Sequence, residues 1–388
     1  MSTSFDVLII GGGPGGYVAA LRAAQLKMRT ALIEREHLGG ICLNWGCIPT
    51  KSLLHTADTL RRIRHAPRLG VSVGEPVIDF GRVMQRSREV AQRLNRGVMH
   101  LLRKAGVTVV NGEAAFAPGR TIRVLGADAS SQSFRAEHAI IATGARARPL
   151  PMLPFDGGRV WSYRDALSAR ELPKSLLVIG AGAIGMEFAS FYASLGCRVT
   201  VIEAQSRPLP SSDADVSEFV AQQFARDGIQ LHVGARLERA DFTRDGVRVT
   251  VQTHAGPQAL EAERVLVAVG LAANTEALAL EHTQVVLERG FVVADATGAT
   301  AAPWVHAIGD VTGAPMLAHR ASHQALACVE RIAAGAHGAD LLHHAPLIPS
   351  CVYSHPQSAA IGMTEDEARA SGRSVRIGRF PLEANGKA

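Results

Sequence analysis

Two stretches of the chain share one order of apolar, glycine-rich and helical segments. Residues 5–10 (FDVLII) form a short continuous apolar run, which is typical of a strand buried in a parallel sheet. A glycine-rich turn, a helical pattern over residues 17–25 and a second apolar run over residues 30–33 follow. The same order returns between residues 176 and 202. This repetition predicts two Rossmann-like α/β units in one chain.

Each unit carries the pattern G-x-G-x-x-G after its first strand and a glutamate at the end of its second strand. The first glycine allows a tight turn, the second lets the backbone approach a pyrophosphate, and the third allows a helix to pack closely on the strand. The helix N-terminus then faces the negative charge. The residues concerned are Gly11, Gly13, Gly15, Gly16 and Glu34 in the first unit and Gly180, Gly182, Ala183, Ile184, Gly185 and Glu203 in the second.

Two dinucleotide sites in one chain are typical of an electron carrier with one bound flavin and one exchangeable nicotinamide. Glu203 stands where a carboxylate accepts hydrogen bonds from a ribose 2′-hydroxyl and repels a 2′-phosphate, so the sequence favours NAD over NADP. Arg207 lies close by, but a single arginine is a poor substitute for a phosphate-binding cluster.

Three further apolar runs, at residues 138–144, 264–270 and 304–310, are expected as strands that complete the two sheets. Ligands in open α/β sheets bind at the carboxyl ends of the strands. Thr143 and Gly144 end the first run and are expected close to a flavin, and Asp310 ends the third, where it suits a hydrogen bond to a sugar or ribityl hydroxyl.

Cys42 and Cys47 lie five residues apart in GGICLNWGCIPTK, where Pro49 and the residues after it indicate a helix start. Thiols near a helix N-terminus, with Lys51 close by, are expected to have lowered pKa values and to be reactive. A zinc site needs two more ligands at suitable spacing. We therefore favour a redox disulfide beside the flavin and expect no metal site. The other cysteines, Cys197, Cys328 and Cys351, are expected to be inert core residues.

Composition narrows the class of protein further. The 388 residues, 47% hydrophobic and 20% charged, suffice for two to three packed domains. The densest basic groups, Arg61–Arg62–Arg64 and Arg82–Arg86–Arg88, are expected on solvated helix faces, so the net charge of +6 does not establish a nucleic-acid partner. Aromatic residues make up only 5%, which argues against a stacking platform for single-stranded nucleic acid. The N-terminus lacks the positive charge of a secretory signal, and no apolar run reaches the roughly 18 residues of a membrane span. These features favour a cytoplasmic enzyme with no membrane association.

Three motifs resemble the pyridine nucleotide–disulfide oxidoreductases, and within them the dihydrolipoamide dehydrogenases. They are GGICLNWGCIPTK at residues 39–51, GAGAIGMEF at 180–188 and AIGDVTGAPMLAHRA at 307–321. The resemblance implies that dihydrolipoyl groups reduce a Cys42–Cys47 disulfide and that the electrons pass through FAD to NAD⁺. It further implies that Cys42 is the exchanging thiol, that Cys47 lies against the flavin, and that Lys51 pairs with Glu187 beside it.

The same resemblance assigns cofactor positions along the chain. The positions implied for FAD are Gly11, Gly13, Gly15, Gly16, Glu34, Gly40, Lys51, the backbone of Ala114, Thr143, Gly144, Asp310, Met316, Leu317, Ala318 and His319. Those implied for NAD are Gly180, Gly182, Ala183, Ile184, Gly185, Glu187, Glu203, Leu237 and Gly270. The chain departs from the family at Ile41, where a threonine is usual, and at residues 271–273, where a basic run is usual.

The resemblance also implies a domain plan. We expect two Rossmann-like, doubly wound, three-layer nucleotide-binding domains plus an incomplete α+β interface domain. Residues 1–146 would form the FAD-binding domain and 147–271 the NAD-binding domain, residues 272–343 would return to the FAD domain, and 344–388 would begin a dimerisation domain with strands at 348–353 and 375–381. The implied partners are a lipoyl domain of a 2-oxo acid dehydrogenase complex and, in the full-length form, a second copy.

One family motif has no match in this chain. Family members carry a His-Pro-x-x-x-Glu motif whose histidine is the acid–base partner of the exchanging thiol, and none of the 15 histidines here precedes a glutamate at that spacing. We therefore expect the sequence to be part of a longer enzyme. The alternatives are an FAD- and NAD-binding module without competent disulfide exchange, or another disulfide reductase such as a mercuric reductase-like enzyme.

Overall fold

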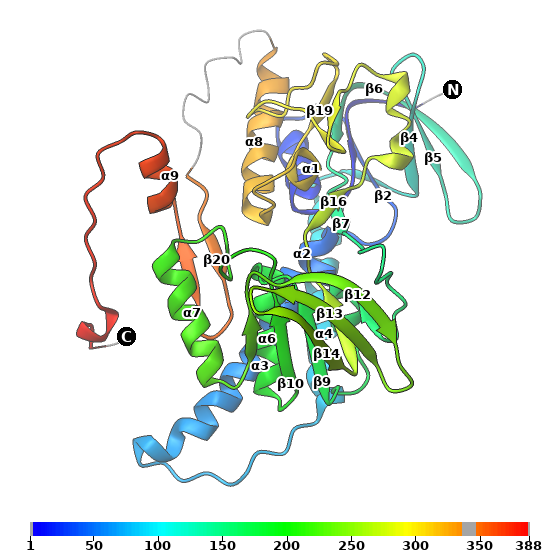
Figure 1. Ribbon diagram of the computed structural model, residues 1–388. Helices are drawn as coiled ribbons and strands as arrows, with labels where there is room; N and C mark the ends of the chain where they lie inside the picture. Colours follow the sequence, from blue (N-terminus) through cyan, green and yellow to red (C-terminus); the bar gives the residue numbers. More distant parts are fainter. Residues whose placement is uncertain (1–2, 336–346, 387–388) are drawn as a thin grey trace.

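The fold is built around two separate sheets, each formed by one of the repeated units (Figure 1). The computed structural model describes residues 3–335 and 347–386. The first sheet has the strand order β3-β2-β1-β6-β5-β4, with β19 paired to β6. Its strands are β1 (Thr3–Ile10), β2 (Thr30–Glu34), β3 (Thr108–Asn111), β4 (Glu113–Ala117), β5 (Thr121–Leu125), β6 (Ser131–Ile141) and β19 (Val305–Ala307).

Both faces of the central strand β1 are buried, which explains its continuous apolar sequence. Val7 and Ile9 pack on one face against helices α1 (Pro14–Gln25), α4 (Phe80–Lys104) and α8 (Ala318–Ala334). Leu8 and Ile10 pack on the other face among residues of β4–β6 and of the segment 273–311. That segment holds η2 (Glu276–Leu278), η3 (Leu280–His282), β17 (Leu287–Glu288), β18 (Phe291–Val292) and η4 (Gly309–Thr312). The carboxyl end of β1 is therefore held rigidly where the glycine-rich turn begins.

The second sheet is wholly parallel and has the order β11-β10-β9-β15-β8. Helices α6 (Ala183–Ser194) and α7 (Ala214–Arg226) cover one face, and the antiparallel sheet β12-β13-β14 covers the other, which gives three layers. The strands are β8 (Val160–Trp161), β9 (Ser175–Ile179), β10 (Arg198–Ile202), β11 (Gln230–His232), β12 (Arg236–Phe242), β13 (Val247–Thr253), β14 (Gly256–Ala262) and β15 (Arg264–Val267).

The two units are joined by a strand pair and by a helical segment. The chain leaves the first unit at β7 (Ala145–Ala147) and returns at β16 (Leu271–Ala273), and these strands pair antiparallel. Helices α2 (Gly40–Trp45) and α3 (Cys47–His65) carry the cysteines. From there η1 (Ala66–Leu69) leads to α4, and α3 packs on both α4 and α6. The cysteine segment thus belongs to the first unit but touches the second.

The C-terminal segment begins with a hairpin of β20 (Ser350–Val352) and β21 (Ser358–Ala360), followed by α9 (Glu365–Ala370) and η6 (Leu382–Ala384). The expected strand at 348–353 is present in shorter form, but the expected strand at 375–381 is wrong. Those residues are mostly exposed and have no neighbouring strand to pair with among the residues described, so no ladder forms. Across residues 3–335 and 347–386, no helix has the length and apolar character that crossing a membrane requires.

Candidate functional site

A cavity of about 310 Å³ lies where the first glycine-rich turn, the cysteine helices and α6 meet. The two units both contribute to its wall, because Ala183, Ile184 and Glu187 of α6 face it together with Cys42 and Cys47. The remaining expected residues that line it are Gly11, Gly13, Gly15, Glu34, Gly40, Lys51, Thr143, Gly144, Asp310, Met316, Leu317 and Ala318. One cavity therefore joins most of the positions expected for FAD to the start of α6 in the second unit.

The first glycine-rich turn can exist only with glycine at its ends. Gly11 has a φ of 105°, and a Cβ on Gly16 would lie 1.8 Å from the carbonyl oxygen of Gly11. The carboxylate of Glu34 accepts hydrogen bonds from the backbone N–H of Gly12 at 2.7 Å and of Glu36 at 2.8 Å. An ionised carboxylate has about four lone-pair sites, so Glu34 keeps capacity for ligand hydroxyl groups.

The second turn repeats these contacts closely. Gly180 has a φ of 104°, and a Cβ on Gly185 would lie 1.9 Å from the carbonyl oxygen of Gly180. Glu203 accepts hydrogen bonds from the N–H of Ala181 at 2.7 Å and of Gln205 at 2.8 Å. Arg207, by contrast, forms an ion pair with Asp366 at 2.9 Å. Its charge is therefore already partnered and does not offset the carboxylate of Glu203.

The two cysteines are placed by a short helix that breaks at Gly46. Cys42 lies within α2, and Cys47 is the first residue of α3. Both thiols are reduced in the structure. A hydrogen bond from Cys42 lowers the pKa of the Cys47 thiol, and the charge of Lys51 lowers it further against the opposing effect of burial. The pKa of Cys42 is raised by the same hydrogen bond and by burial. Cys47 is therefore the thiol that ionises first.

Lys51 on α3 and Glu187 on α6 form an ion pair across the cavity. The ammonium lies 2.8 Å from each carboxylate oxygen, and the Glu187 side chain is only 7% exposed. The backbone N–H of Tyr353 donates to the same carboxylate at 3.0 Å, and the Tyr353 ring lies 4.6 Å from the Lys51 ammonium. Tyr353, which directly follows β20 in the C-terminal hairpin, thus contacts both partners of the pair.

A dinucleotide with ribityl or ribose hydroxyls also fits the part of the cavity that Asp310 and α8 line. Burial raises the pKa of Asp310, and the carboxylate of Asp310 accepts no hydrogen bond from any residue that the structure describes. A half-buried carboxylate that accepts no hydrogen bond suits a hydroxyl donor from a ligand, even with the charge of Arg320 acting on it. The N-terminus of α8 lacks a side-chain cap, and its first residue, Ala318, lines the cavity. These donors and acceptors match the needs of a bound FAD.

The other positions expected to bind FAD or NAD do not line this cavity. Ala114 lines a neighbouring cavity that also reaches Glu34. Leu237 is partly buried against the core of the second sheet, and Gly270 adopts a φ of 110° just before β16. The His319 ring faces the carbonyl oxygen of Pro349 at 2.7 Å and does not line the cavity.

One expectation about the cysteines is wrong. Cys197 and Cys328 are buried, but Cys351 is exposed and lines the same cavity as the redox pair. The reason is strand alternation in β20, where Val352 points into the core and Cys351 therefore points away from it. A two-residue period in the sequence is the signal that could have revealed this.

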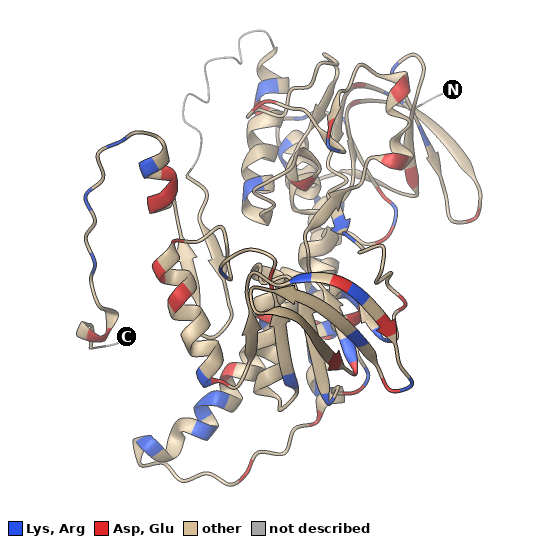
Figure 2. Cartoon of the chain, viewed as in Figure 1, with Lys and Arg blue, Asp and Glu red and all other residues tan. Residues whose placement is uncertain are grey.

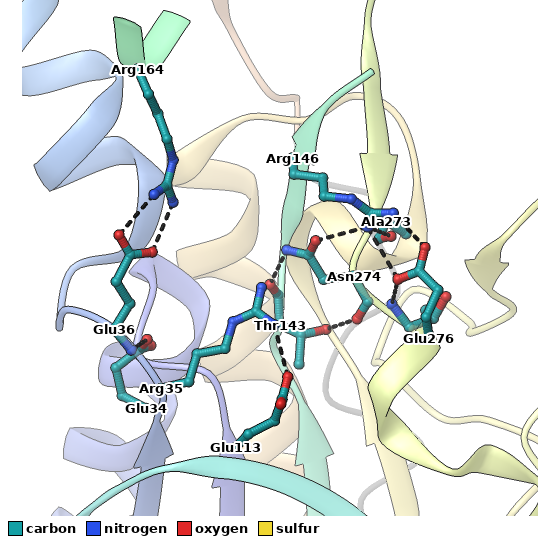
Figure 3. A network of polar contacts seen from close by, with 11 residues as sticks. Glu34, Arg35, Glu36, Glu113, Thr143, Arg146, Arg164, Ala273, Asn274 and Glu276 are labelled. Carbon is teal, nitrogen blue, oxygen red and sulfur yellow. Dashed lines mark hydrogen bonds and ion pairs between the residues drawn. The ribbon is translucent and has the colours of Figure 1, made fainter. Parts of the chain in front are cut away.

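Sequence reasoning also missed a set of ion pairs beside Glu34 (Figure 3). Arg164 of α5 (Tyr163–Ala166), in the second unit, binds Glu36 of the first unit through two hydrogen bonds of 2.7 and 2.8 Å. Arg35 pairs with Glu113 at 3.0 Å, and Arg146 pairs with Glu276. These contacts join residues far apart in sequence, so no local pattern announces them. They fix the rim of the cavity between the two units.

Tyr353→Leu is expected to raise the pKa of Cys47, because losing the ring frees Lys51 to move away from the thiol. A cation–π contact at such a site contributes about 0.5–1 kcal/mol. The readout is the pH dependence of alkylation of the reduced protein by iodoacetamide, which reports thiolate formation. Tyr353→Phe keeps the ring and is expected to behave as the unmodified protein. Equal shifts in both variants would contradict a role for the ring.

The chain matches one protein family over almost its whole length. The model of the family described as pyridine nucleotide-disulphide oxidoreductase matches residues 5–325, and the dimerisation domain of the same family matches residues 348–388. The chain is 46% identical to a dihydrolipoyl dehydrogenase from Zymomonas mobilis and 40% identical to one from Bacillus subtilis. In both comparisons all of this chain aligns with 83% of the relative.

Solved structures agree with the sequence matches. LpdA from Mycobacterium tuberculosis has a TM-score of 0.90 and 29% identity, over 99% of this chain and 83% of that one. The HOCl-induced flavoprotein disulfide reductase RclA from Escherichia coli has a TM-score of 0.82 and 30% identity, over 99% of this chain and 83% of that one.

Proposed function

Because this chain belongs to the pyridine nucleotide-disulphide oxidoreductase family, we propose that it oxidises dihydrolipoyl groups and reduces NAD⁺ with the help of FAD, as a dihydrolipoyl dehydrogenase does. The dithiol loses two electrons and two protons; NAD⁺ takes the electron pair with one proton, and the other proton is released. Bound FAD supplies the two-electron carrier between thiols and nicotinamide. The observation that carries the proposal is the cavity that joins the cysteine pair and the first glycine-rich turn to the start of α6 in the second unit.

The two cysteines divide the thiol chemistry between them. In the oxidised protein they form a disulfide, and a dihydrolipoyl thiolate attacks the sulfur of Cys42, which breaks the Cys42–Cys47 bond and leaves Cys47 as the thiolate. The second dihydrolipoyl thiol then displaces Cys42 and closes the lipoyl disulfide. The lowered pKa of Cys47 supports its part as the leaving thiolate, because thiols of low pKa leave faster. The raised pKa of Cys42 supports its return as a protonated thiol.

Lys51, held in place by Glu187, stabilises the Cys47 thiolate in this step. The Lys51 charge favours the Cys47 thiolate, and Glu187 holds the ammonium in place because both of its carboxylate oxygens are engaged at 2.8 Å. Glu187 also lies on α6, just after the second glycine-rich turn. The ion pair therefore positions the thiolate relative to the nicotinamide site, and both residues belong to the proposed catalytic set.

The proposed partners follow from the same comparisons. We propose that the dihydrolipoyl substrate is carried by a lipoyl domain of a 2-oxo acid dehydrogenase complex, as in the dihydrolipoyl dehydrogenases that this chain resembles. We also propose a homodimer, which the match of residues 348–388 to a dimerisation domain supports. Glu203 supports NAD⁺ as the electron acceptor in place of NADP⁺.

The proposed function is tested by supplying dihydrolipoamide and either NAD⁺ or NADP⁺ to the FAD-loaded protein under anaerobic conditions. We expect one NADH for each dihydrolipoamide oxidised and a kcat/KM for NADP⁺ that is at least about 100-fold lower, given the carboxylate at Glu203. A protein that reduces neither nucleotide, or that prefers NADP⁺, would contradict the proposal.

A further inference from the structure

The helical segment between the two units holds the net positive charge of the chain. Residues 61–104 contain 11 Lys and Arg side chains and 3 Asp and Glu side chains, a net charge of +8, whereas the whole chain has +6. All other residues together therefore carry a small negative net charge. Figure 2 shows part of this concentration as lysine and arginine along the distal end of α3. The charge is thus gathered on one segment of the chain, from the end of α3 through α4.

Most of this charge lies along one side of α4. At about 100° per residue, the basic residues of its outer side fall within roughly one third of the helix circumference. The opposite side contains Met84, Ala91, Val98 and Leu102, which are buried. Glu89 is the only acidic residue of α4. We call the outer side the basic face; it consists of Arg82, Arg86, Arg93, Arg96, Arg103 and Lys104, all exposed.

Four of these cations have no partner. Within the part of the chain that the structure describes, the side chains of Arg93, Arg96, Arg103 and Lys104 form neither a hydrogen bond nor an ion pair. Arg88 behaves differently, because it lies against the Trp45 ring and donates to the carbonyl oxygen of Asn44. The basic face therefore projects an uncompensated positive potential, which attracts an anionic surface.

The basic face begins beside the redox cysteines. Arg86 donates to the Ser52 hydroxyl at 2.9 Å, and Ser52 lies about one and a half turns along α3 from Cys47. Arg88, one half-turn further along α4, donates to Asn44 of α2 at 2.7 Å. From there α4 continues into contact with α1 and β3. A protein bound along this helix would therefore have one end near the segment that carries Cys42 and Cys47.

We propose that the basic face is a docking surface for an acidic protein domain that carries the dihydrolipoyl group. The proposal rests on the proposed function and adds the recognition of the carrier to it. Between Arg82 and Lys104 the face is about 33 Å long at 1.5 Å per residue, far longer than a dihydrolipoyl group and matched to a protein–protein interface. A single-stranded nucleic acid would need aromatic side chains for base stacking, and the sole aromatic residue of α4, Phe80, packs against Tyr192.

Docking on the basic face is expected to affect kcat/KM for a lipoylated domain but not for free dihydrolipoamide. Complementary charge increases the rate of encounter and is weakened by salt. Free dihydrolipoamide is uncharged and small, so it gains nothing from the basic face. The double variant Arg93→Glu/Arg96→Glu is therefore expected to lower kcat/KM for an acidic lipoylated domain by about 10-fold or more at low ionic strength. Its kcat/KM for free dihydrolipoamide should stay within about twofold.

The matched control is Arg236→Glu on β12, an exposed arginine that also has no partner among the described residues. It changes the net charge of the protein without touching the basic face, so both substrates are expected to react as with the unmodified protein. Arg93→Gln/Arg96→Gln, which keeps helix-forming side chains, serves as a second variant with a smaller expected loss. At about 0.5 M salt, the unmodified protein and the three variants are expected to have similar kcat/KM values for the lipoylated domain.

Direct binding separates this proposal from the proposed function. Calorimetric titration with the unlipoylated domain tests docking even if the protein does not oxidise dihydrolipoamide. A failure of turnover with both substrates but tight, salt-sensitive binding would contradict only the proposed function. Four results would each overturn the docking surface. The first two are equal losses for both substrates and unchanged binding of the domain by the Arg93→Glu/Arg96→Glu variant. The other two are displacement of the domain by duplex DNA at equal concentration and a changed oligomeric state in sedimentation.

Discussion

Replacing Cys42 with serine is expected to abolish the oxidation of dihydrolipoamide while FAD stays bound. A serine hydroxyl cannot form a disulfide, so the electron pair of the substrate has no route to Cys47. We expect kcat to fall by about 10³-fold or more, in line with the loss of other nucleophiles that form covalent intermediates. The measurements are NADH formation from dihydrolipoamide and the flavin content of the purified protein. Loss of the flavin in this variant would indicate a structural part for Cys42.

Cys351→Ser is the matched control for this experiment. It makes the same substitution at a third thiol that lines the same cavity, but one that no step of the proposed reaction uses. Dihydrolipoamide turnover is expected to stay within about twofold, because the side chain is exposed and buries little surface. If Cys351→Ser removed activity and Cys42→Ser retained it, the assignment of the redox pair would be wrong.

The repeated units could be predicted from the sequence because their signals are local. Three signals lie within about 25 residues of one another: a continuous apolar run, a glycine where φ must be positive, and an acidic residue at the end of the next strand. Steric contact between backbone atoms leaves few alternative conformations for such a segment. The structure makes the same pair of hydrogen bonds at Glu34 and at Glu203. The pattern of the second unit is expected to end at residue 202, which is the last residue of β10.

Contacts between distant elements could not be predicted in the same way. Arg164 reaches Glu36 only because α5 and the end of β2 meet at the boundary of the two units. Tyr353 reaches Glu187 only because β20 packs on α6. Neither arginine nor tyrosine has a sequence neighbour that signals its partner. The same limit explains the error at residues 375–381, since a strand needs a partner strand as well as a favourable composition.

Arginines that look alike in the sequence have different surroundings in the structure. The arginines of residues 61–64 and 82–88 look alike in sequence, where all of them are expected on solvated faces. In the structure Arg61 and Arg64 donate to residues of α6, Arg86 donates to Ser52 of α3, and Arg88 is held against Trp45. These four arginines thus bind the cysteine helices to their neighbours. The arginines left outward on α4 are the ones free to recognise another molecule.

Gly185→Ala and Gly182→Ala are expected to fail in different ways although they lie three residues apart. A Cβ on Gly185 would lie 1.9 Å from the carbonyl oxygen of Gly180, and neither backbone can move because β9 and α6 are buried. We expect the second unit to be destabilised by more than about 4 kcal/mol, a loss that only a severe backbone clash or an unpaired buried charge produces. Thermal unfolding and the yield of folded protein measure this effect.

Gly182→Ala meets no atom within 4 Å, and Gly182 has a φ of −75°, which alanine adopts readily. Its methyl group would instead occupy the space that the pyrophosphate of NAD⁺ must approach. We expect normal thermal stability, normal reduction of the bound FAD by dihydrolipoamide, and a KM for NAD⁺ raised by about 10-fold or more. An unchanged KM would mean that NAD⁺ does not lie over the second turn, whereas slowed flavin reduction would mean that this turn shapes the redox cavity itself.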